Sequence, residues 1–119
     1  MSFFQKLFGK KESSIQTYQD FWDWFLQHEQ RFHKVVKQMD HQRIETDFFN
    51  LLSPKLAALH EGYFFLAGML DDETVDLVIT AEGIVKNFVF VEELVATAPS
   101  IKGWNFTALK PAIQGDGFS

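Results

Sequence analysis

Two stretches decide the fold of this chain: YFFLAGML at residues 63–70 and APSIKGWNFTALKP at residues 98–111. The first is short, almost wholly apolar and rich in aromatic side chains, which predicts a buried strand. In the second, Trp104, Phe106 and Ala108 alternate with polar residues, which predicts a strand that ends at Lys110-Pro111. We expect the remaining chain to connect these strands or to cover them.

A third strand is predicted at residues 75–80, VDLVIT, where apolar and more polar side chains alternate. The acidic turn before it suggests a hairpin with residues 63–70. Successive side chains of a strand point to opposite faces of the sheet, and residues 63–70 are apolar at both odd and even positions. We therefore expect both faces of this strand to be covered. This places that strand between the other two, in the order 2-1-3.

Residues 84–91, IVKNFVFV, fit either a strand or a helix. The spacing of Phe88, Val91, Val95 and Ala98 favours a helix over residues 87–98, with Asn87 as its cap. Pro99 would end it. If the strands on either side share a sheet, this helix is a right-handed crossover.

The first part of the chain predicts helices. From about Ser14 to Asp40 an apolar stripe recurs at helical spacing, and Ser13 or Ser14 can cap it. Helical spacing continues over residues 42–52, and Ser53-Pro54 looks like the start of another helix that ends at Gly62. The stripe of the first helix consists of Tyr18, Phe21, Phe25, His28, Phe32, Val35 and Met39, widened by Trp22, Trp24 and Val36.

The expected class is therefore α+β, with the order α-α-β-β-α-β. A helical layer would pack on a small, mostly antiparallel, three-stranded sheet with one crossover helix. We expect a single domain over residues 13–111, preceded by a basic amphipathic arm at 1–12. Residues 112–119 lack periodicity, which suggests a tail or the beginning of a further region of a longer protein.

The stretch from residue 75 to 111 resembles a family of uncharacterised bacterial proteins. In that family a strand with a Ser/Thr-Ala-x-Gly turn leads to a helix with a Leu-Val pair, then Ala-Pro, Gly-Trp and a strand ending Ala-Leu-Lys-Pro. The resemblance implies an α+β fold and a bacterial origin, and it carries no catalytic residue. The matching positions are Thr80, Ala81, Gly83, Leu94, Val95, Ala98, Pro99, Gly103, Trp104, Ala108, Leu109, Lys110 and Pro111.

The signature also has a structural interpretation. Pro99 ends a helix, Gly103 allows a turn, and Trp104 anchors the last strand to the core. Lys110 and Pro111 end that strand. We therefore expect these five residues to specify structure in preference to a ligand site.

Composition excludes several classes of function. The 119 residues contain no cysteine, which rules out disulfides, thiolate metal sites and cysteine nucleophiles. Fourteen phenylalanines and three tryptophans predict a well-formed aromatic core. No apolar run is long enough for a membrane helix and no secretory signal is evident, so a cytoplasmic location is the default.

Charge is concentrated in the middle of the chain. Residues 61–93 contain eight acidic side chains against Lys86 alone, a net charge of −7. This argues against nucleic-acid binding and favours either a solvated face or a basic protein partner. The predicted partner-binding residues are Asp71, Asp72, Glu73 and Asp76. Their spacing matches no calcium-binding loop.

The arm at residues 1–12 combines apolar and basic residues. Phe3, Phe4, Leu7 and Phe8 would share one side of a short helix, with three lysines nearby. One interpretation is weak, reversible contact with anionic lipid. The other is a frayed or packed terminal arm.

The histidines predict no metal site and no cofactor. His28 lies within the apolar stripe, where a hydrogen-bonded core residue is the simpler interpretation. Glu29 and His33 share a helix face, but two ligands are too few for a metal ion.

The leading functional hypothesis is a non-enzymatic binding or interaction module of an accessory or immunity type. The oligomeric state, including a homodimer, stays open. The alternative is a small hydrolase or transferase that uses Glu92 or Glu93 with His28 or His60 in a cleft between helix and sheet.

Overall fold

The structure is a computed structural model that describes residues 15–110. It confirms the α+β class and the predicted order of helices and strands. The predicted arm, with Phe3, Phe4, Leu7 and Phe8, lies outside the described residues, as do Pro111 and the predicted tail at residues 112–119. The elements in order are α2 (Tyr18–Lys37), α3 (His41–Ile44), the π-helical turn η1 (Glu45–Phe49), α4 (Asn50–Ala57), β1 (Phe64–Met69), β2 (Val75–Thr80), the 3₁₀ turn η2 (Val85–Asn87), α5 (Phe88–Ala96) and β3 (Trp104–Leu109).

Helix α2 begins at a capping box that the sequence analysis did not identify. The hydroxyl of Thr17 accepts a hydrogen bond from the Asp20 N–H at 3.0 Å, and the Asp20 carboxylate accepts one from the Thr17 N–H at 3.1 Å. Ser13 and Ser14, the predicted caps, lie outside the described residues. The predicted apolar stripe is largely correct, because Phe21, Trp22, Phe25, Phe32 and Val36 are buried.

The second helical segment is continuous, so the predicted restart at Ser53-Pro54 is wrong. It runs from His41 to Ala57, and Pro54 lies inside α4. The π-helical turn adds a residue to the helical turn, which brings two consecutive aromatic side chains toward the core. Phe48 packs 4.8 Å from Phe32, and Phe49 packs 5.5 Å from Phe65 of β1, between ring centroids.

Strand β2 is the centre of the sheet, so the predicted order 2-1-3 is wrong. The observed order is β1-β2-β3, with β1 antiparallel to β2 and β2 parallel to β3, which makes the sheet mixed. Apolar residues at both parities of β1 do not mean that both of its faces are covered, because Phe64 and Leu66 are exposed. In β2 the alternation is real, and Val75, Leu77 and Ile79 are completely buried.

The ambiguous segment is helical, as predicted, with η2 leading into α5. Its expected cap is wrong, since the Asn87 side chain makes no capping hydrogen bond. Helix α5 connects two parallel strands, a crossover that such strands require. Val91 and Leu94 of α5 belong to the same core as Phe21 and Trp22 of α2, so both helices pack on one face of the sheet.

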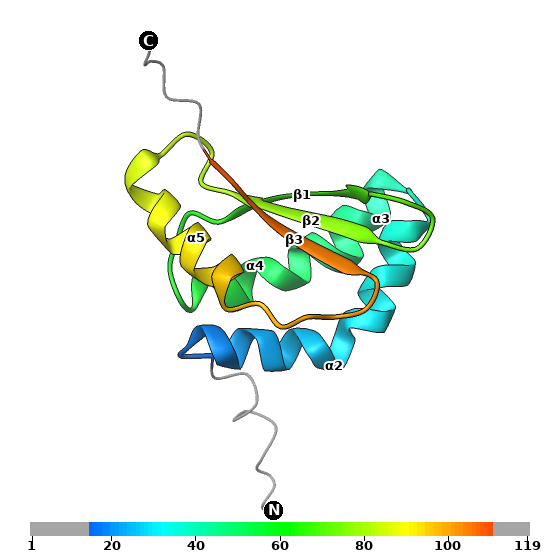
Figure 1. The fold of residues 1–119 in the computed structure, drawn as a ribbon, viewed down its shortest axis with the longest axis horizontal. Coiled ribbons are helices and arrows are strands. Elements are labelled where there is room, and N and C mark those ends of the chain that lie inside the picture. Colours follow the sequence, from blue (N-terminus) through cyan, green and yellow to red (C-terminus); the bar gives the residue numbers. More distant parts are fainter. Residues whose placement is uncertain (1–14, 111–119) are drawn as a thin grey trace, which may run out of the picture.

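The core lies between this face and the helices (Figure 1). Trp22 meets Phe106 of β3 edge to face at 4.7 Å between ring centroids, and its indole N–H donates to the Leu94 carbonyl at 3.0 Å. This buried hydrogen bond connects α2 to α5. Both partners are surrounded by apolar side chains, where a hydrogen bond is strong and its loss is costly.

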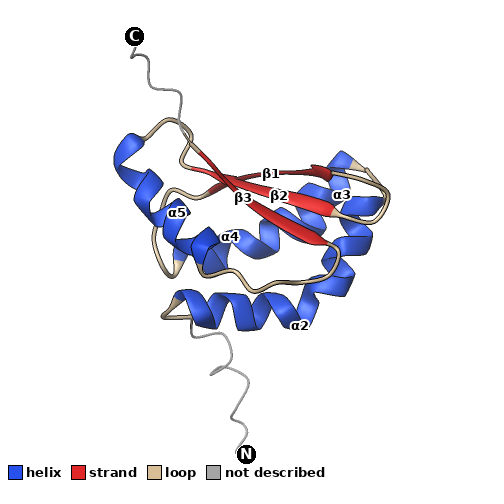
Figure 2. Cartoon of the chain, in the orientation of Figure 1, coloured by secondary structure: helices blue, strands red, loops and turns tan. Residues whose placement is uncertain are grey.

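The other face of the sheet, which we call the outer face, is open. Helices α2 and α4 lie on one side of the three strands in Figure 2. On the outer face Phe64 and Leu66 of β1 are 45% and 56% exposed, and Leu109 of β3 is 45% exposed. Large apolar side chains grouped on one surface are typical of an interaction site.

The two neighbouring tryptophans of α2 provide a test of the core. We expect Trp22→Phe to lower the free energy of unfolding by about 1–3 kcal/mol, because it removes a buried hydrogen bond and leaves unfilled volume. Trp24→Phe is the control, since Trp24 is only partly buried and hydrogen-bonds to no residue in the range 15–110. Urea unfolding measures both, and an equal loss in the two variants would contradict the assignment.

Candidate functional site

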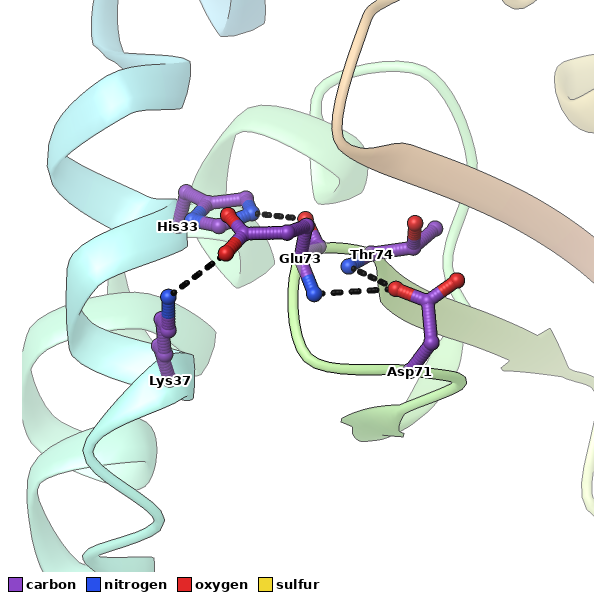
Figure 3. Close-up of polar contacts among 5 residues, drawn as sticks. All are labelled: His33, Lys37, Asp71, Glu73 and Thr74. Atoms are coloured by element: carbon purple, nitrogen blue, oxygen red, sulfur yellow. Dashed lines mark hydrogen bonds and ion pairs between the residues drawn. The ribbon is translucent and has the colours of Figure 1, made fainter.

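The turn between β1 and β2 contains three of the four acidic residues singled out from the sequence. We call residues 71–74 the acidic turn. Asp71 shapes it: its carboxylate accepts hydrogen bonds from the N–H groups of Glu73 and Thr74, at 2.9 and 2.8 Å. These bonds favour the ionised form, so the bond from Glu73 and then that from Thr74 lower the pKa of Asp71. Asp71 therefore has a structural role in the turn (Figure 3).

Glu73 attaches the acidic turn to helix α2. Its carbonyl oxygen lies 2.8 Å from Nε2 of His33, and its carboxylate lies 3.5 Å from Nζ of Lys37 (Figure 3). A carbonyl only accepts, so Nε2 of His33 carries the proton. The ion pair is exposed at both ends and is worth at most about 1 kcal/mol. The sequence offers one signal for this contact, the four-residue spacing of Glu29, His33 and Lys37 along one side of α2.

Asp76 is on the outer face, near the same end of the sheet. Its carboxylate accepts hydrogen bonds from Asn105 Nδ2 at 2.8 Å and Thr107 Oγ1 at 3.0 Å, which join β2 to β3. Three of the four predicted partner-binding acids thus have intramolecular contacts. Asp72 is exposed and contacts no polar group within residues 15–110. Partner binding by the four acids stays a prediction.

A solvent-open pocket of about 720 Å³ lies beside the acidic turn. The Glu29 carboxylate at this pocket accepts a hydrogen bond from Trp104 Nε1 at 2.8 Å. The imidazole ring of His33 and the amines of Lys34 and Lys102 also line the pocket. The residues that line the pocket are Glu29, Gln30, His33, Lys34, Glu73, Thr74, Lys102 and Gly103. Within residues 15–110 no group of three or more His, Asp or Glu side chains is placed to bind a metal ion.

Gly103 lines the same pocket and directly precedes β3. Its φ is +89°, a conformation that side chains other than glycine's rarely adopt, and its carbonyl accepts from the Val75 N–H at 2.8 Å. A Cβ here would lie 3.1 Å from Nε2 of His33. Pro99 follows the end of α5, and Lys110 follows β3. These positions agree with a structural role for the described part of the Gly-Trp signature.

One group of the enzymatic alternative, His28, lies on α2 beside aromatic side chains. The His28 ring packs beside Trp24 and Phe32, at 5.3 and 5.9 Å, and it hydrogen-bonds to no residue in the described range. The expectation of a hydrogen-bonded histidine was therefore wrong. Burial lowers the pKa of His28, with smaller effects from the nearby cations Arg31 and Lys55.

The other three groups of the enzymatic alternative each have contacts of their own. His60 stacks on Phe90 at 3.7 Å and contacts the Glu61 carbonyl. Glu93 accepts a hydrogen bond from the Tyr18 hydroxyl at 2.8 Å, and burial together with this bond raises the pKa of Tyr18. Glu92 is exposed. The pocket at residues 26–31, the pocket beside the acidic turn and the pocket around His60 are not lined by Glu92 or Glu93.

Comparison with protein-family models, curated proteins and solved structures found no significant match to this chain. The resemblance of residues 75–111 to a bacterial family therefore stays an expectation. Among the described helices, none has the length and apolar character needed to cross a membrane.

A substitution at Gly103 tests the close approach of this residue to His33 of α2. We expect Gly103→Ala to lower the free energy of unfolding by about 1–3 kcal/mol, because the new methyl group meets His33 at an unfavourable φ. Gly68→Ala on β1 is the control, since a Cβ there meets no atom within 4 Å and we expect a change within about 0.5 kcal/mol. Urea unfolding of the two variants decides the matter. Equal stability would contradict the close approach.

The lowered pKa of His28 predicts a dependence of stability on pH. The unfolded chain binds a proton at His28 more readily than the folded chain, so stability falls as the pH drops below the ordinary value of 6.5. We expect His28→Gln to flatten the change in urea midpoint between about pH 7 and pH 5. The exposed His41→Gln is the control. Wild-type behaviour in His28→Gln would show that burial of this ring has no effect on its titration.

Proposed function

We propose that this chain is a non-enzymatic protein-interaction module that binds a basic partner through the outer face of its sheet. The observation that carries the proposal is the open outer face itself. Phe64, Leu66 and Leu109 are exposed there, whereas the helices pack on the opposite face. Burial of such side chains is the main source of affinity at protein interfaces, since each buried apolar group leaves water.

Charge supports a basic partner in preference to a second copy of the chain. The segment from residue 61 to 93, with its net charge of −7, includes β1, the acidic turn and β2. Asp72 and Asp76 lie near one end of the outer face. A second copy would bring the same negative charge to the contact, whereas lysine or arginine side chains would be attracted and would associate faster. The same charge disfavours nucleic acid.

The module would act as an accessory or immunity-type protein in the cytoplasm of a bacterium. The absence of cysteine agrees with a reducing compartment. Within the proposal, Asp71 shapes the acidic turn, Glu73 attaches it to α2, and Asp72 is the acid of the turn best placed to meet a partner.

Two exposed leucines allow a matched test. We expect Leu66→Glu on the outer face to abolish retention of a partner that wild-type chain captures and mass spectrometry identifies. Leu26→Glu is the control, because Leu26 is similarly exposed but lies on α2. Capture that survives Leu66→Glu, or that is lost equally in Leu26→Glu, would exclude the outer face.

The acids are tested on the same captured protein. We expect Asp72→Asn to weaken capture, and more strongly at low salt, because the attraction is screened as ionic strength rises. Glu45→Gln removes the same charge from the helical layer and is expected to have little effect. A wild-type chain that retains no protein above the Leu66→Glu background would overturn the proposal as a whole.

A further inference from the structure

Strand β1 forms an edge of the sheet that pairs with a strand on one side only. The order β1-β2-β3 places β2 on that side, and no strand of residues 15–110 lies on the other (Figure 1). The six residues of β1 span about 20 Å. An edge of this length presents a row of unpaired backbone groups, which makes it a template for another strand.

The hydrogen-bond pattern identifies the backbone groups on this edge. In an antiparallel pair, residues that bond to the partner strand alternate with residues that point away from it. The Leu70 N–H donates to the Thr74 carbonyl at 2.8 Å, so the even-numbered residues of β1 bond to β2. The odd-numbered residues, whose N–H and C=O groups point to the open edge, are Phe65, Ala67 and Met69.

A second hydrogen bond agrees with this assignment. Val75 pairs with Met69, but its N–H donates to the Gly103 carbonyl at 2.8 Å, so Val75 bonds toward β3. The two residues of such a pair point in opposite directions, and Met69 therefore faces the open edge. Among residues 15–110, no hydrogen bond reaches the N–H groups of Phe65, Ala67 and Met69.

Strand β1 lacks the features that normally protect an edge. Natural edge strands carry charged side chains, proline or a bulge that prevents pairing with another chain. Residues 62–70 contain no charged side chain and no proline, and the register with β2 runs without a bulge from Phe64 to Met69. An unprotected edge beside exposed apolar side chains indicates a place where a strand is added.

We propose that the basic partner of the outer face supplies an extended segment that joins the sheet beside β1. This inference rests on the proposed function and specifies how the partner binds. The backbone of the segment would bond to Phe65, Ala67 and Met69. Its side chains on the outer face would lie next to Phe64 and Leu66, which are exposed on the same strand. The backbone bonds would supply affinity, and the side-chain contacts would supply specificity.

Charge selects this occupant over a second copy of the chain. Glu61 precedes the uncharged residues 62–70, and Asp71 and Asp72 follow them. If two copies of β1 paired antiparallel about their centres, Glu61 of each copy would lie opposite Asp72 of the other, and these like charges would repel. A segment with lysine or arginine on both sides of an apolar centre would meet an acid at each end.

Hydrogen exchange of the backbone amides tests the edge in the free full-length chain. We expect the amides of Phe65, Ala67 and Met69 to exchange faster than those of Leu66 and Gly68, which donate to β2. Equal protection of all five amides would show that the edge is already occupied and would overturn the proposal. Protection that appears together with a dimer in sedimentation velocity would assign the edge to a second copy, which also overturns it.

The complex with the captured partner tests the mode of binding. We expect the amides of Phe65, Ala67 and Met69 to exchange at least about tenfold more slowly in the complex. Ala67→Pro removes an N–H from the open edge but leaves the bonds between β1 and β2 in place, so we expect binding to weaken about tenfold or more.

Ala108→Pro is the matched control for the proline variant. Ala108 is also half-buried, and its N–H points to the opposite edge of the sheet, because the odd-numbered residues of β3 bond to β2. We expect this variant to bind like the wild-type chain. Urea unfolding shows that both variants are folded, and the exchange measurement on the wild-type complex decides alone if Ala67→Pro is not.

The charge at the start of the strand has its own control. We expect Glu61→Gln to weaken binding about two- to fivefold at low salt, and Glu45→Gln in the helical layer to have little effect. Equal affinity of these two variants would contradict selection by charge.

The outcomes separate strand addition from the proposed function. Capture that depends on Leu66 but leaves the amides of Phe65, Ala67 and Met69 unprotected would overturn strand addition and keep the outer face as the binding surface. Equal binding by Ala67→Pro and Ala108→Pro would do the same. A wild-type chain that captures no partner overturns both.

Discussion

The fold depends on the burial of one indole ring, that of Trp104, between the sheet and the helices. The ring lies edge to face with Phe25 of α2 at 4.9 Å, 5.8 Å from Phe48 of η1 and stacked with Phe106 at 5.7 Å, between centroids. Its N–H donates to Glu29. One side chain thus contacts both helical segments and fixes the start of β3. Aromatic contacts of this kind add specific geometry to a large buried area.

The corner around Trp104 explains why the acidic turn has its observed position. Gly103, which precedes Trp104, has no side chain and so allows the backbone to lie close to His33 of α2. The same histidine hydrogen-bonds to the Glu73 carbonyl. The Gly103 carbonyl in turn accepts from Val75, the first residue of β2. The turn is therefore held against α2 by contacts that also set the register of the parallel pair. Its acids are presented on a rigid support, which suits recognition better than a loose loop does.

The described helices pack on one face of the sheet, and this leaves the outer face exposed. On that face Phe64 and Leu109 lie at one end of the strands and Asp76 lies at the other end, next to the acidic turn. In the proposed complex with a basic partner, apolar contact would supply affinity while charge would select the partner, a division of roles common at protein interfaces.

Local sequence pattern by itself determined the helices α2 and α5, the alternating strand β2 and the strand that follows Gly103. Each follows from a periodicity of side chains within one short segment. Only the tertiary structure decided the strand order, because pairing depends on contacts between distant segments. Apolar residues at both parities of β1 suggested a central strand, yet that strand is at the edge and exposes Phe64 and Leu66. The acids of residues 71–76 could be found in the sequence, but their separate hydrogen bonds could not, since Asn105, Thr107 and Lys37 are distant along the chain.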